Sequence, residues 1–500
     1  MPSDPLGPLA STAADPGEIA LFVRRVTDLV KGPAVACAAG ATVAEAAQLM
    51  TRRSVGSVIV VDGDGAAAGI VTDRDLRTRV VAQGLSPSTA VGLVMSSPVI
   101  GIGPEAAAFD ALLEMTRRGV HHLAVTAGGR LLGVVSSHDL VLLQGIHPVG
   151  LAREIEAQVS EEGLVAVASR IAGVVKWLAA GGAGSARIGR LVAELNDRLV
   201  ERALSLVMSS LEASGHGRPP VPFAWLAAGS EGRREQTLRT DQDNGLVYRD
   251  SPVDLELAAA EYFERLAAAM GESLIRLGFP PCAGGFMASN PRWRQPERAW
   301  RERFRSWMET PQPEAVLRAS LFFDLRPIAG DVAVGRDLWE WVCELAPTRT
   351  LFLRYMARAS LERQVPLGFF GGFVVERTGA HKGRLDLKAR AVFPVTHAMR
   401  VCALSLGVRE TNTLDRLEAA GARGIFTASE AADLGEAYEV ISRIRLTHQI
   451  ACLDAGIEPD NLIDPRKLGK ADRILLKEAF KSIAWLQRGV ADRFQTALVG

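Results

Sequence analysis

The most informative stretch of this chain is Ala228-Gly229-Ser230-Glu231-Gly232-Arg233-Arg234-Glu235-Gln236-Thr237-Leu238-Arg239-Thr240-Asp241-Gln242-Asp243-Asn244. If residues 241–243 are extended, their side chains alternate between two faces, so Asp241 and Asp243 point the same way. Neighbouring carboxylates repel each other unless a cation joins them, and hard oxygen ligands suit Mg²⁺, or Mn²⁺ in its place. Gly229 lets the backbone approach a ligand, and Ser230 offers a hydroxyl and an amide to phosphate. Phosphoryl or nucleotidyl transfer requires these components.

The composition predicts a globular protein with about three domains, at roughly 150 residues each. Apolar residues make up 48% of the 500 residues, and 57 basic residues balance 57 acidic ones. A net charge of zero gives no overall basic field that favours nucleic acid or anionic lipid, although a local patch stays possible. We therefore expect neither nucleic acid nor membrane among the partners.

The termini and cysteines indicate the compartment. The five cysteines are scattered without a C-x-x-C spacing, so neither a disulfide framework nor a thiolate zinc site is expected. Residues 1–17 lack the basic start and apolar core of a signal peptide and predict a disordered leader. The most apolar stretch, 164–180, contains Arg170 and Lys176 and does not predict a membrane span. The sequence predicts a soluble, cytoplasmic protein.

A duplicated unit occupies the N-terminal part of the chain. Met50-Thr51-Arg52-Arg53 recurs as Met115-Thr116-Arg117-Arg118, and the segment 69–76 (GIVTDRDL) recurs at 133–140 (GVVSSHDL). Separate matches at nearly the same spacing indicate a repeated structural unit. Each copy predicts a helix, a β-branched strand, a Gly-rich turn, a second strand and a closing helix.

These copies resemble a tandem pair of cystathionine-β-synthase (CBS) domains over about residues 31–144, through the pattern G-h-h-[ST]-x-x-D. The resemblance implies an adenosine nucleotide in the cleft between the copies, and it makes a homodimer the expected state. The implied ligand contacts are Thr72, Asp75, Ser136 and Asp139. Helix capping explains the same residues equally well, because Ser, Thr and Asp are ordinary caps. Many CBS pairs act only as dimerisation or packing modules.

The Gly-Ser/D-x-D combination resembles the DNA polymerase β-like nucleotidyltransferases. It is more closely similar to the nucleotidyltransferases fused to CBS domains, which are related to the uridylyltransferases and adenylyltransferases of nitrogen regulation. The resemblance implies that Asp241 and Asp243 are catalytic and hold Mg²⁺, and that Gly229 and Ser230 bind the outgoing phosphates. Arg233 and Arg234 are then expected to neutralise charge on the pyrophosphate; the alternative for both arginines is a solvated helix face.

A third carboxylate is usual in that superfamily, but the corresponding segment 278–288 contains no acid. Asp324 is the candidate replacement, with a structural pairing to Arg326 or a cap as the alternative. With two acids only, the site is expected to bind Mg-nucleotide yet to transfer slowly or not at all.

Other residues follow from the same resemblance. Arg292 and Arg294 are expected to touch nucleotide or acceptor, or else to lie at a rim where Trp293 is the packing anchor. Lys388, with Arg400, is expected to face the triphosphate from a helix-rich C-terminal part. His397 and His448 are expected to be buried, hydrogen-bonded residues.

The predicted fold is α/β and α+β, in several domains. The expected order is a leader (1–17), a CBS pair within 18–148 (about 31–84 and 95–144), a helical linker (149–219), a polymerase-β-like domain with a mixed sheet (220–337) and a helical substrate-binding domain (338–500). For the linker, two helices packed into one domain are the alternative. The predicted function is transfer of a nucleoside monophosphate from an NTP such as ATP to a protein acceptor, controlled by the CBS ligand. The competing prediction is an inactive nucleotide-binding signalling protein that acts through partner contacts.

Overall fold

The computed structural model describes residues 24–30, 32–140, 148–238, 241–368 and 371–499. The predicted leader (1–17), Arg239 and Thr240 lie outside the described residues. The described chain divides into two compact units: the first comprises 24–153 and 180–183, and the second comprises 154–179 and 184–499, with the gaps just given.

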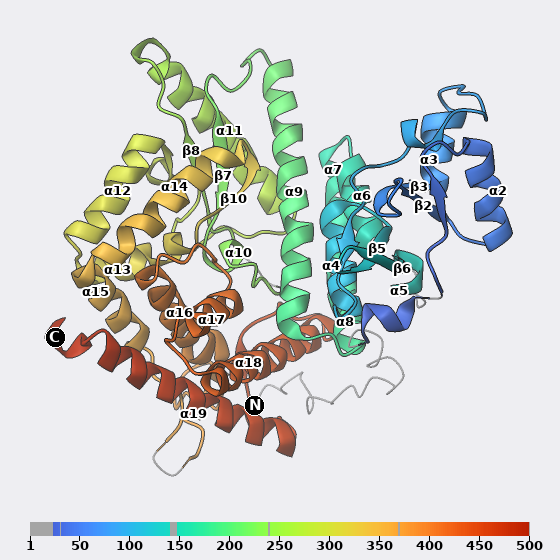
Figure 1. Ribbon diagram of the computed structural model, residues 1–500. Helices are drawn as coiled ribbons and strands as arrows, with labels where there is room; N and C mark the ends of the chain where they lie inside the picture. The colour runs from blue at the N-terminus through green and yellow to red at the C-terminus, as the bar shows by residue number, and fades with distance from the viewer. Residues whose placement is uncertain (1–23, 31, 141–147, 239–240, 369–370, 500) are drawn as a thin grey trace. The chain divides into compact units, whose positions relative to one another are not determined.

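The first unit contains the duplicated fold (Figure 1). Each copy forms a three-stranded sheet in which the first two strands are parallel and the last two antiparallel. The first copy consists of β1 (Ala36–Ala38), α2 (Val43–Arg53), β2 (Ser57–Val61), β3 (Ala67–Thr72) and α3 (Asp73–Asp75). The second consists of β4 (Gly101–Ile102), α4 (Ala108–Arg118), β5 (His122–Ala127), β6 (Arg130–Ser136) and α5 (Ser137–Leu140). The identical element order confirms the predicted duplication.

Local sequence signals explain the helix of the first copy. Thr42 and Glu45 form a capping box at the start of α2, and the helix ends on Ser54, whose φ is 51°. Met50 on α2 packs against Val58 and Val71 of the strands, so the β-branched strands bury the apolar face of the helix.

The second unit is built on a mixed four-stranded sheet with the order β10-β7-β8-β9. Its strands are β7 (Phe223–Ala227), β8 (Asn244–Tyr248), β9 (Arg294–Pro296) and β10 (Arg326–Gly330). Only β8 and β9 run parallel among these described strands. The predicted mixed sheet is confirmed.

Helices cover both faces of this sheet. Phe223 and Tyr248 contact Phe263 of α11 (Glu256–Arg276), at ring centroid distances of 5.2 and 4.6 Å. The opposite face, with Leu226 and Val247, belongs to the main core beneath α12 (Glu297–Glu309) and α14 (Val332–Leu345). In Figure 1, α14 lies across β7 and β10, which it contacts. The alternation of side chains along each strand therefore buries the sheet on both sides.

The helices before the sheet are α6 (Pro148–Ala157), α7 (Glu161–Ala168), α8 (Ile171–Ala180) and α9 (Ser185–Ala213). The long helix α9 packs on α11 and β10, so most of the predicted linker forms part of the second unit. The described residues contain one helical stretch, Glu161–Ala180, that is long and apolar enough to cross a membrane by length and composition alone. This stretch consists of α7 and α8, and Leu164 and Val174 within it are buried.

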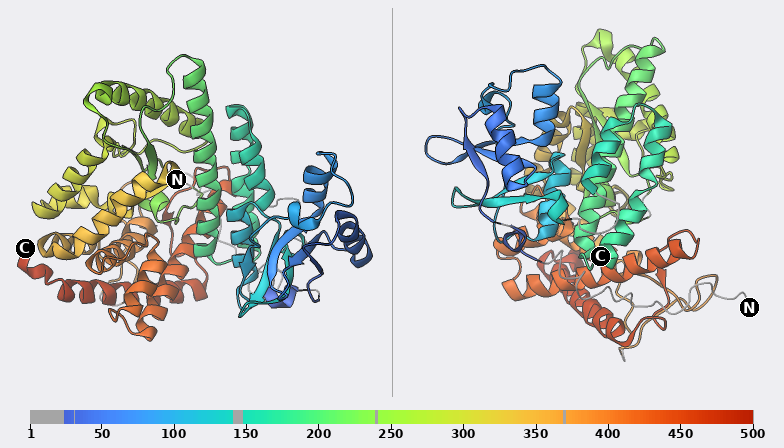
Figure 2. Two further views of the ribbon diagram at one scale, coloured as in Figure 1. Left: turned by 45° about the horizontal axis from the view of Figure 1, so that its top comes forward. Right: turned by 90° about the vertical axis from the view of Figure 1, so that its right-hand side faces the viewer.

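The C-terminal part is helical, as predicted. Its main helices are α15 (Thr350–Leu361), α16 (Phe393–Ser405), α17 (Thr413–Ala422), α18 (Ala428–Asp454) and α19 (Lys470–Arg493), and a short ladder pairs β11 (Leu385–Asp386) with β12 (Leu462–Ile463). Figures 1 and 2 show α18 and α19 side by side. One core runs from Leu226 in the sheet to Val490 in α19. The boundary expected at 337/338 falls inside α14, so the sheet and the C-terminal helices share their packing.

Candidate functional site

The turn after β7 is shaped by two glycines. Gly229 has a φ of 56°, and a Cβ at this position would lie 2.5 Å from Oδ2 of Asp243. A Cβ on Gly232 would lie 1.9 Å from the carbonyl oxygen of Asp324. The amide of Ala228 donates to the carbonyl oxygen of Asp243 at 2.8 Å. The short helix α10 (Gly229–Gly232) can therefore lie against Asp243 at one end and Asp324 at the other only because the two glycines lack side chains.

The two aspartates of the D-x-D pattern come together as expected. One oxygen of Asp241, one oxygen of Asp243 and the sulfur of Cys282 all lie within 4.8 Å of one another. Burial and, second, the negative charge of Asp241 raise the pKa of Asp243 to about 6, although the Cys282 thiol and the Lys388 charge oppose the rise. A buried carboxylate with a second carboxylate beside it fits a divalent cation, because the cation relieves both desolvation and repulsion.

The segment expected to carry a third acid does lie beside these aspartates. The amide of Gln242 donates to the carbonyl oxygen of Pro280 at 2.9 Å, and the amide of Asn244 donates to that of Phe286 at 3.0 Å. The third position of the cluster holds Cys282. Cys282 was not predicted from the sequence as a ligand, because an acid was expected at this position. The available signal was that Cys282 lies in the segment 278–288, where the third ligand was expected.

Cys282 lies among both acidic and donor groups. Burial raises the pKa of its thiol to about 11, and the Asp243 charge contributes to the rise. The sulfur accepts hydrogen bonds from the backbone amides of Phe286 and Gly284, which act in the opposite direction.

The structure corrects the prediction for Asp324. This side chain is completely buried, and its two oxygens accept hydrogen bonds from three arginines, Arg233, Arg400 and Arg416. Although burial opposes ionisation, Arg400, Arg233 and Arg416 hold the pKa of Asp324 well below its usual range. Asp324 is therefore the buried centre of an ion cluster and does not supply a third metal ligand.

The alternative prediction, that Asp324 pairs with Arg326, was also wrong. Arg326 donates instead to Asp197 of α9, at 2.6 and 2.8 Å. The ion pair of Arg326 and Asp197 links β10 to α9. The Asp324 carboxylate is therefore paired only with the three arginines named above among the described residues.

Arg233 needs a similar correction. Its Nε donates to Glu235 at 2.7 Å and its Nη1 donates to Asp324 at 2.5 Å, and only 8% of the residue is exposed. The guanidinium braces the turn and does not project toward a phosphate as predicted. Its neighbour Arg234 is half-buried with a φ of 56°, and its predicted phosphate contact stays a prediction.

The N-terminal end of α17 holds the same turn in place. Thr411 Oγ1 donates to the carbonyl oxygen of Gly232 at 2.7 Å, and Asn412 Nδ2 donates to that of Arg233 at 2.9 Å. The amide of Thr413 donates to Glu235 at 2.6 Å. Residues more than 170 positions away in the sequence thus hold the chain from Gly232 to Glu235.

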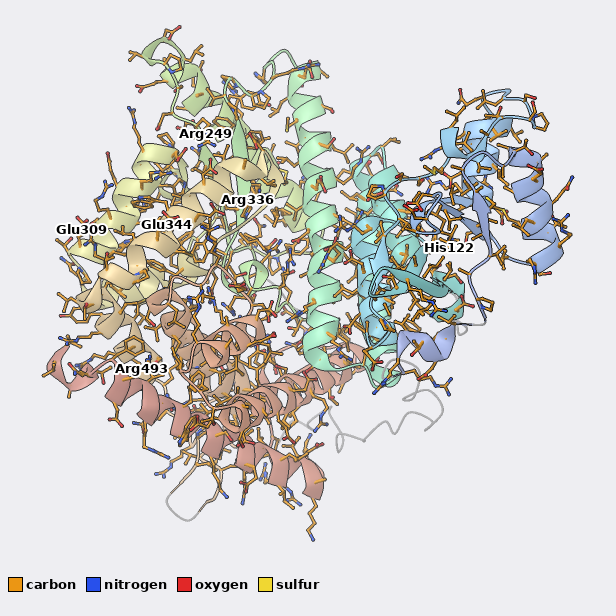
Figure 3. All side chains as sticks on the ribbon, in the orientation of Figure 1. His122, Arg249, Glu309, Arg336, Glu344 and Arg493 are labelled. Carbon is orange, nitrogen blue, oxygen red and sulfur yellow. The ribbon has the colours of Figure 1, made fainter. Side chains whose placement is uncertain are left out.

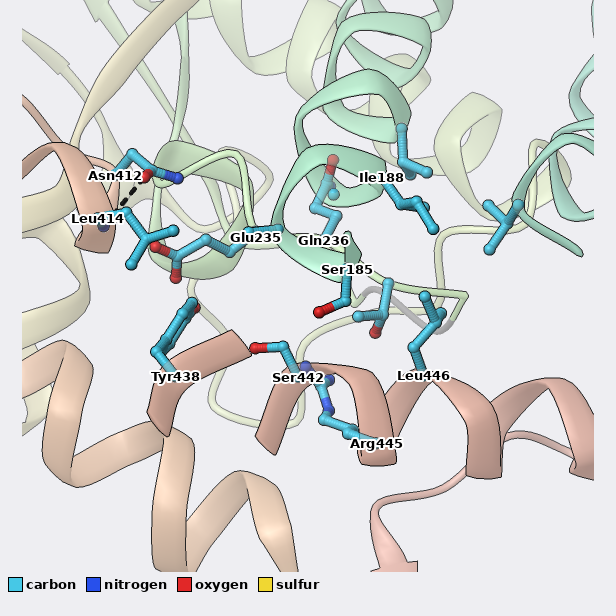
Figure 4. A pocket seen from close by; sticks show the side chains of 15 residues that line it. Ser185, Ile188, Glu235, Gln236, Asn412, Leu414, Tyr438, Ser442, Arg445 and Leu446 are labelled. Atoms are coloured by element: carbon cyan, nitrogen blue, oxygen red, sulfur yellow. Dashed lines mark hydrogen bonds between the residues drawn. The ribbon is translucent and has the colours of Figure 1, made fainter. Parts of the chain in front are cut away.

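A small cavity lies behind this turn, between α9, α17 and α18 (Figure 4). Its volume of about 20 Å³ is close to that of one water molecule. In Figure 4, Tyr438 of α18 lies beside Glu235, and the hydroxyl of Tyr438 hydrogen-bonds to the Glu235 carboxylate. Burial raises the pKa of Tyr438 well above its usual value, and the Glu235 charge adds to the rise. The residues that line the cavity pack against the turn, and the cavity is too small for a nucleotide.

Among the predicted cations of the C-terminal part, Lys388 lies near the acids. It is exposed at the start of the helical turn η8 (Lys388–Val392), and its charge lowers the pKa of Asp243. Arg400 is committed to Asp324 instead. His397 is buried and stacks on Phe393 at 3.8 Å, and His448 contacts Asp460 at 2.6 Å.

The Asn-Pro-Arg-Trp-Arg segment (290–294) serves as a frame. Arg294 donates to the carbonyl oxygen of Ala288 at 2.9 Å, and Trp293 donates to that of Gly285 at 3.0 Å and packs 4.3 Å from Phe322. The packing alternative therefore holds for Trp293 and Arg294, while Arg292 is exposed.

In the first unit, the four predicted ligand residues cap helices. Thr72 Oγ1 donates to Asp75 at 2.7 Å and accepts from the Asp75 amide at 3.3 Å. Ser136 and Asp139 repeat this arrangement in the second copy.

Acidic residues of both copies interact electrostatically with His122 of β5, which is labelled in Figure 3. Burial lowers the pKa of His122, and the negative charges of Asp139 and Asp75 oppose this effect. An aspartate of each copy therefore acts on the same imidazole, which places both predicted acids around one region between the copies.

Comparisons with known proteins agree with this organisation. The family model "CBS domain" matches residues 26–82 and 91–144. The model "Putative nucleotidyltransferase DUF294" matches residues 169–314, and "Putative nucleotidyltransferase substrate binding domain" matches residues 350–494. The linker predicted at 149–219 thus overlaps the nucleotidyltransferase match.

Individual relatives share only part of the chain. The CBS domain-containing protein YhcV of Bacillus subtilis is 35% identical over 103 residues, which are 21% of this chain and 73% of that protein. The CBS domain-containing protein CBSCBSPB2 of Arabidopsis thaliana is 35% identical over 134 residues, 27% of this chain and 24% of that protein. The chain thus spans about a quarter of the length of that relative.

Similar solved structures also cover a part. A CBS domain protein from Pyrobaculum aerophilum, complexed with AMP, is 28% identical and covers 24% of this chain and 93% of its own, with a TM-score of 0.23. A CBS-domain-containing protein from Agrobacterium tumefaciens is 32% identical with the same coverage and TM-score.

Proposed function

Because this chain belongs to the family of CBS-domain proteins that carry a nucleotidyltransferase domain and its substrate-binding domain, we propose that it transfers a nucleoside monophosphate from an NTP to an acceptor. A protein is the proposed acceptor, ATP or UTP the proposed donor, and Mg²⁺ or Mn²⁺ the proposed cofactor. The observation that carries the proposal is the pair Asp241 and Asp243, which lie close together, with Asp243 against the Gly229 turn.

The chain's own residues have distinct roles in this reaction. Asp241 and Asp243 would hold the ion, which when bound acidifies the attacking hydroxyl and neutralises phosphate charge. The Gly229 backbone and Ser230 would bind the outgoing phosphates, because the turn lies directly against Asp243 and offers backbone amides and a hydroxyl. Arg234 and Lys388 would offset charge on the pyrophosphate. Asp324 and Arg233 would act indirectly, because their cluster keeps the turn in position.

The CBS pair is the proposed regulator. An adenosine nucleotide bound between the copies would contact Asp75 and Asp139, which retain acceptor capacity while they cap their helices. If binding at this site changes the affinity of the second unit for NTP, the NTP must change the affinity of the CBS ligand by the same factor. A homodimer and a cytoplasmic location complete the proposal.

The competing function is a nucleotide-binding signalling protein without transferase activity. The observation that favours it is the cysteine in the third ligand position, together with the commitment of Asp324 to three arginines.

Labelled nucleotide distinguishes the two functions. The full chain is incubated with labelled ATP or UTP, Mg²⁺ and a cell lysate, in parallel with the double variant Asp241→Ala/Asp243→Ala and the variant Asp254→Ala, which changes an exposed acid away from the site. Transfer predicts label on an acceptor with the wild type and with Asp254→Ala, and background label with the double variant. Equal label in all three samples overturns the catalytic assignment.

A further inference from the structure

We propose that the metal site of this chain is completed by the sulfur of Cys282, giving a donor set of two carboxylates and one thiolate. The resident ion of the nucleotide-free protein is then of the Zn²⁺ or Co²⁺ class. Mg²⁺ would arrive with the triphosphate, which supplies the oxygen ligands that Mg²⁺ prefers. The inference deepens the proposed function and rests on the same site, but its test requires no transfer activity.

The geometry permits one ion to contact all three side chains. The ligand atoms of Asp241, Asp243 and Cys282 lie within 4.8 Å of one another. With Zn–S of about 2.3 Å and Zn–O of about 2.0–2.2 Å, ligand atoms around a tetrahedral ion are separated by roughly 3.3–3.7 Å. Movements of about 1 Å by these side chains therefore suffice to form the site.

Two backbone amides beside the sulfur favour the thiolate, whereas burial and the Asp243 charge disfavour it, and a bound cation would offset that charge. The Cys282 sulfur lies within 4.8 Å of an Asp243 oxygen, and the thiol lowers the pKa of that carboxyl. The backbone amides of Phe286 and Gly284 interact with the sulfur and lower the pKa of the thiol. When a metal ion binds, the thiol proton leaves to solvent and a sulfur–metal bond takes its place. The two amides remain to stabilise the thiolate, as outer-shell donors do in metal sites.

The backbone around Cys282 is held firmly. Asn290 Nδ2 and Trp293 Nε1 both donate to the carbonyl oxygen of Gly285, at 3.2 and 3.0 Å. The amide of Ala288 donates to Asn244 Oδ1 at 2.8 Å, which ties the segment to the first residue of β8. A ligand that is positioned before the ion arrives loses little entropy on binding.

The type of ligand atom at the third position determines which metal ion the site prefers. A thiolate is a soft ligand that favours Zn²⁺, Co²⁺ and similar ions, whereas Mg²⁺ prefers oxygen ligands and retains water. The exchange of a carboxylate for a thiolate at the third position is therefore expected to shift the preference of the protein away from Mg²⁺.

A second group of possible metal ligands provides the control. His448, Cys452 and Asp460 also lie within 4.8 Å of one another, with His448 and Cys452 one turn apart on α18. In this group the imidazole already contacts the carboxylate at 2.6 Å, and the amide of Leu462 donates to the same oxygen. Any cobalt signal must therefore be assigned to one cysteine or the other.

The test uses Co²⁺ and the nucleotide-free full chain. Thiolate coordination gives a sulfur-to-cobalt charge-transfer band in the near ultraviolet. We expect this band in the wild type and in Cys452→Ser and its loss in Cys282→Ser, with Zn²⁺ affinity falling by about 100-fold or more in Cys282→Ser. Circular dichroism checks that both variants are folded.

A further variant tests the choice of ion. Cys282→Asp is expected to lose the band and to gain affinity for Mn²⁺, measured from the signal of free Mn²⁺ in electron paramagnetic resonance. A band that persists in Cys282→Ser, or that disappears only in Cys452→Ser, overturns the proposal, and so does the absence of a band in the wild type. The labelled-nucleotide experiment can succeed or fail independently, because it depends on Asp241 and Asp243 in the presence of Mg²⁺.

Discussion

The carboxylate of Asp324 receives the guanidinium of Arg400 side-on, with Nε donating to Oδ1 at 2.9 Å and Nη2 donating to Oδ2. Asp324 precedes β10 of the sheet and Arg400 belongs to α16 of the C-terminal helices. The pair is therefore a buried ionic link between the nucleotidyltransferase-type sheet and the helical part.

Asp324→Asn is expected to destabilise the second unit strongly. The change leaves Arg233, Arg400 and Arg416 buried around a neutral group, and breaking a buried pair in this way costs about 3–5 kcal/mol. Urea unfolding followed by circular dichroism measures the loss. The exposed Asp254→Asn is the control and should stay within about 0.5 kcal/mol of the wild type. Equal stability of the two variants would show that the cluster contributes nothing.

Gly229→Ala separates backbone strain from damage to the metal site. Gly128 has nearly the same φ, 55° against 56°, but a Cβ at Gly128 meets nothing within 4 Å. Both substitutions should cost about 1–2 kcal/mol from the left-handed backbone. Only Gly229→Ala should weaken divalent-ion binding, measured by calorimetry, because its Cβ displaces Asp243. Unchanged ion binding in Gly229→Ala would contradict the geometry of the turn.

Glu231 predicts a pH dependence of stability. Burial raises its pKa from 4.5 to about 8, with Asp197 adding to the rise and Arg326 opposing it. The folded state then binds more protons than the unfolded state between these values, so stability falls as pH rises through the window, by at most about 1.4 kcal/mol per pH unit.

Glu231→Gln should remove this slope and raise stability at pH 8 more than at pH 5. Unfolding curves in urea at both pH values measure the difference, with the exposed Glu436→Gln as the matched control. A slope that survives Glu231→Gln would have to come from another buried acid.

The capping boxes of the first unit allow ligand binding to be tested apart from helix stability. Thr42 and Thr72 make the same reciprocal contacts, with Glu45 and Asp75 respectively. Thr42→Ala and Thr72→Ala should each cost about 1 kcal/mol.

Only Thr72→Ala should also weaken binding of AMP, ADP or ATP to the full chain in calorimetry. Equal affinities in both variants would leave Thr72 as a cap alone. An absence of heat with all three nucleotides in the wild type would remove the sensor proposal.

The sequence predicted features that depend on short-range pattern. The same-side placement of Asp241 and Asp243 follows from the two-residue period of an extended chain, and the duplication follows from repeated letters. The role of Asp324 could not be predicted from the sequence, because its three arginine partners lie 91, 76 and 92 residues away and no periodicity connects them to it. Arg233 was misassigned for the same reason. Cys282 was missed because the expected residue type was an acid.

The core that runs from the sheet to α19 has a practical consequence for anyone who wishes to exchange modules within this family. A cut at residue 337 would sever α14 and separate Asp324 from Arg400 and Arg416. A fragment ending there would expose an apolar surface and an acid that keeps only one of its three arginine partners. Chimaeras should therefore keep the sheet and the C-terminal helices from the same parent.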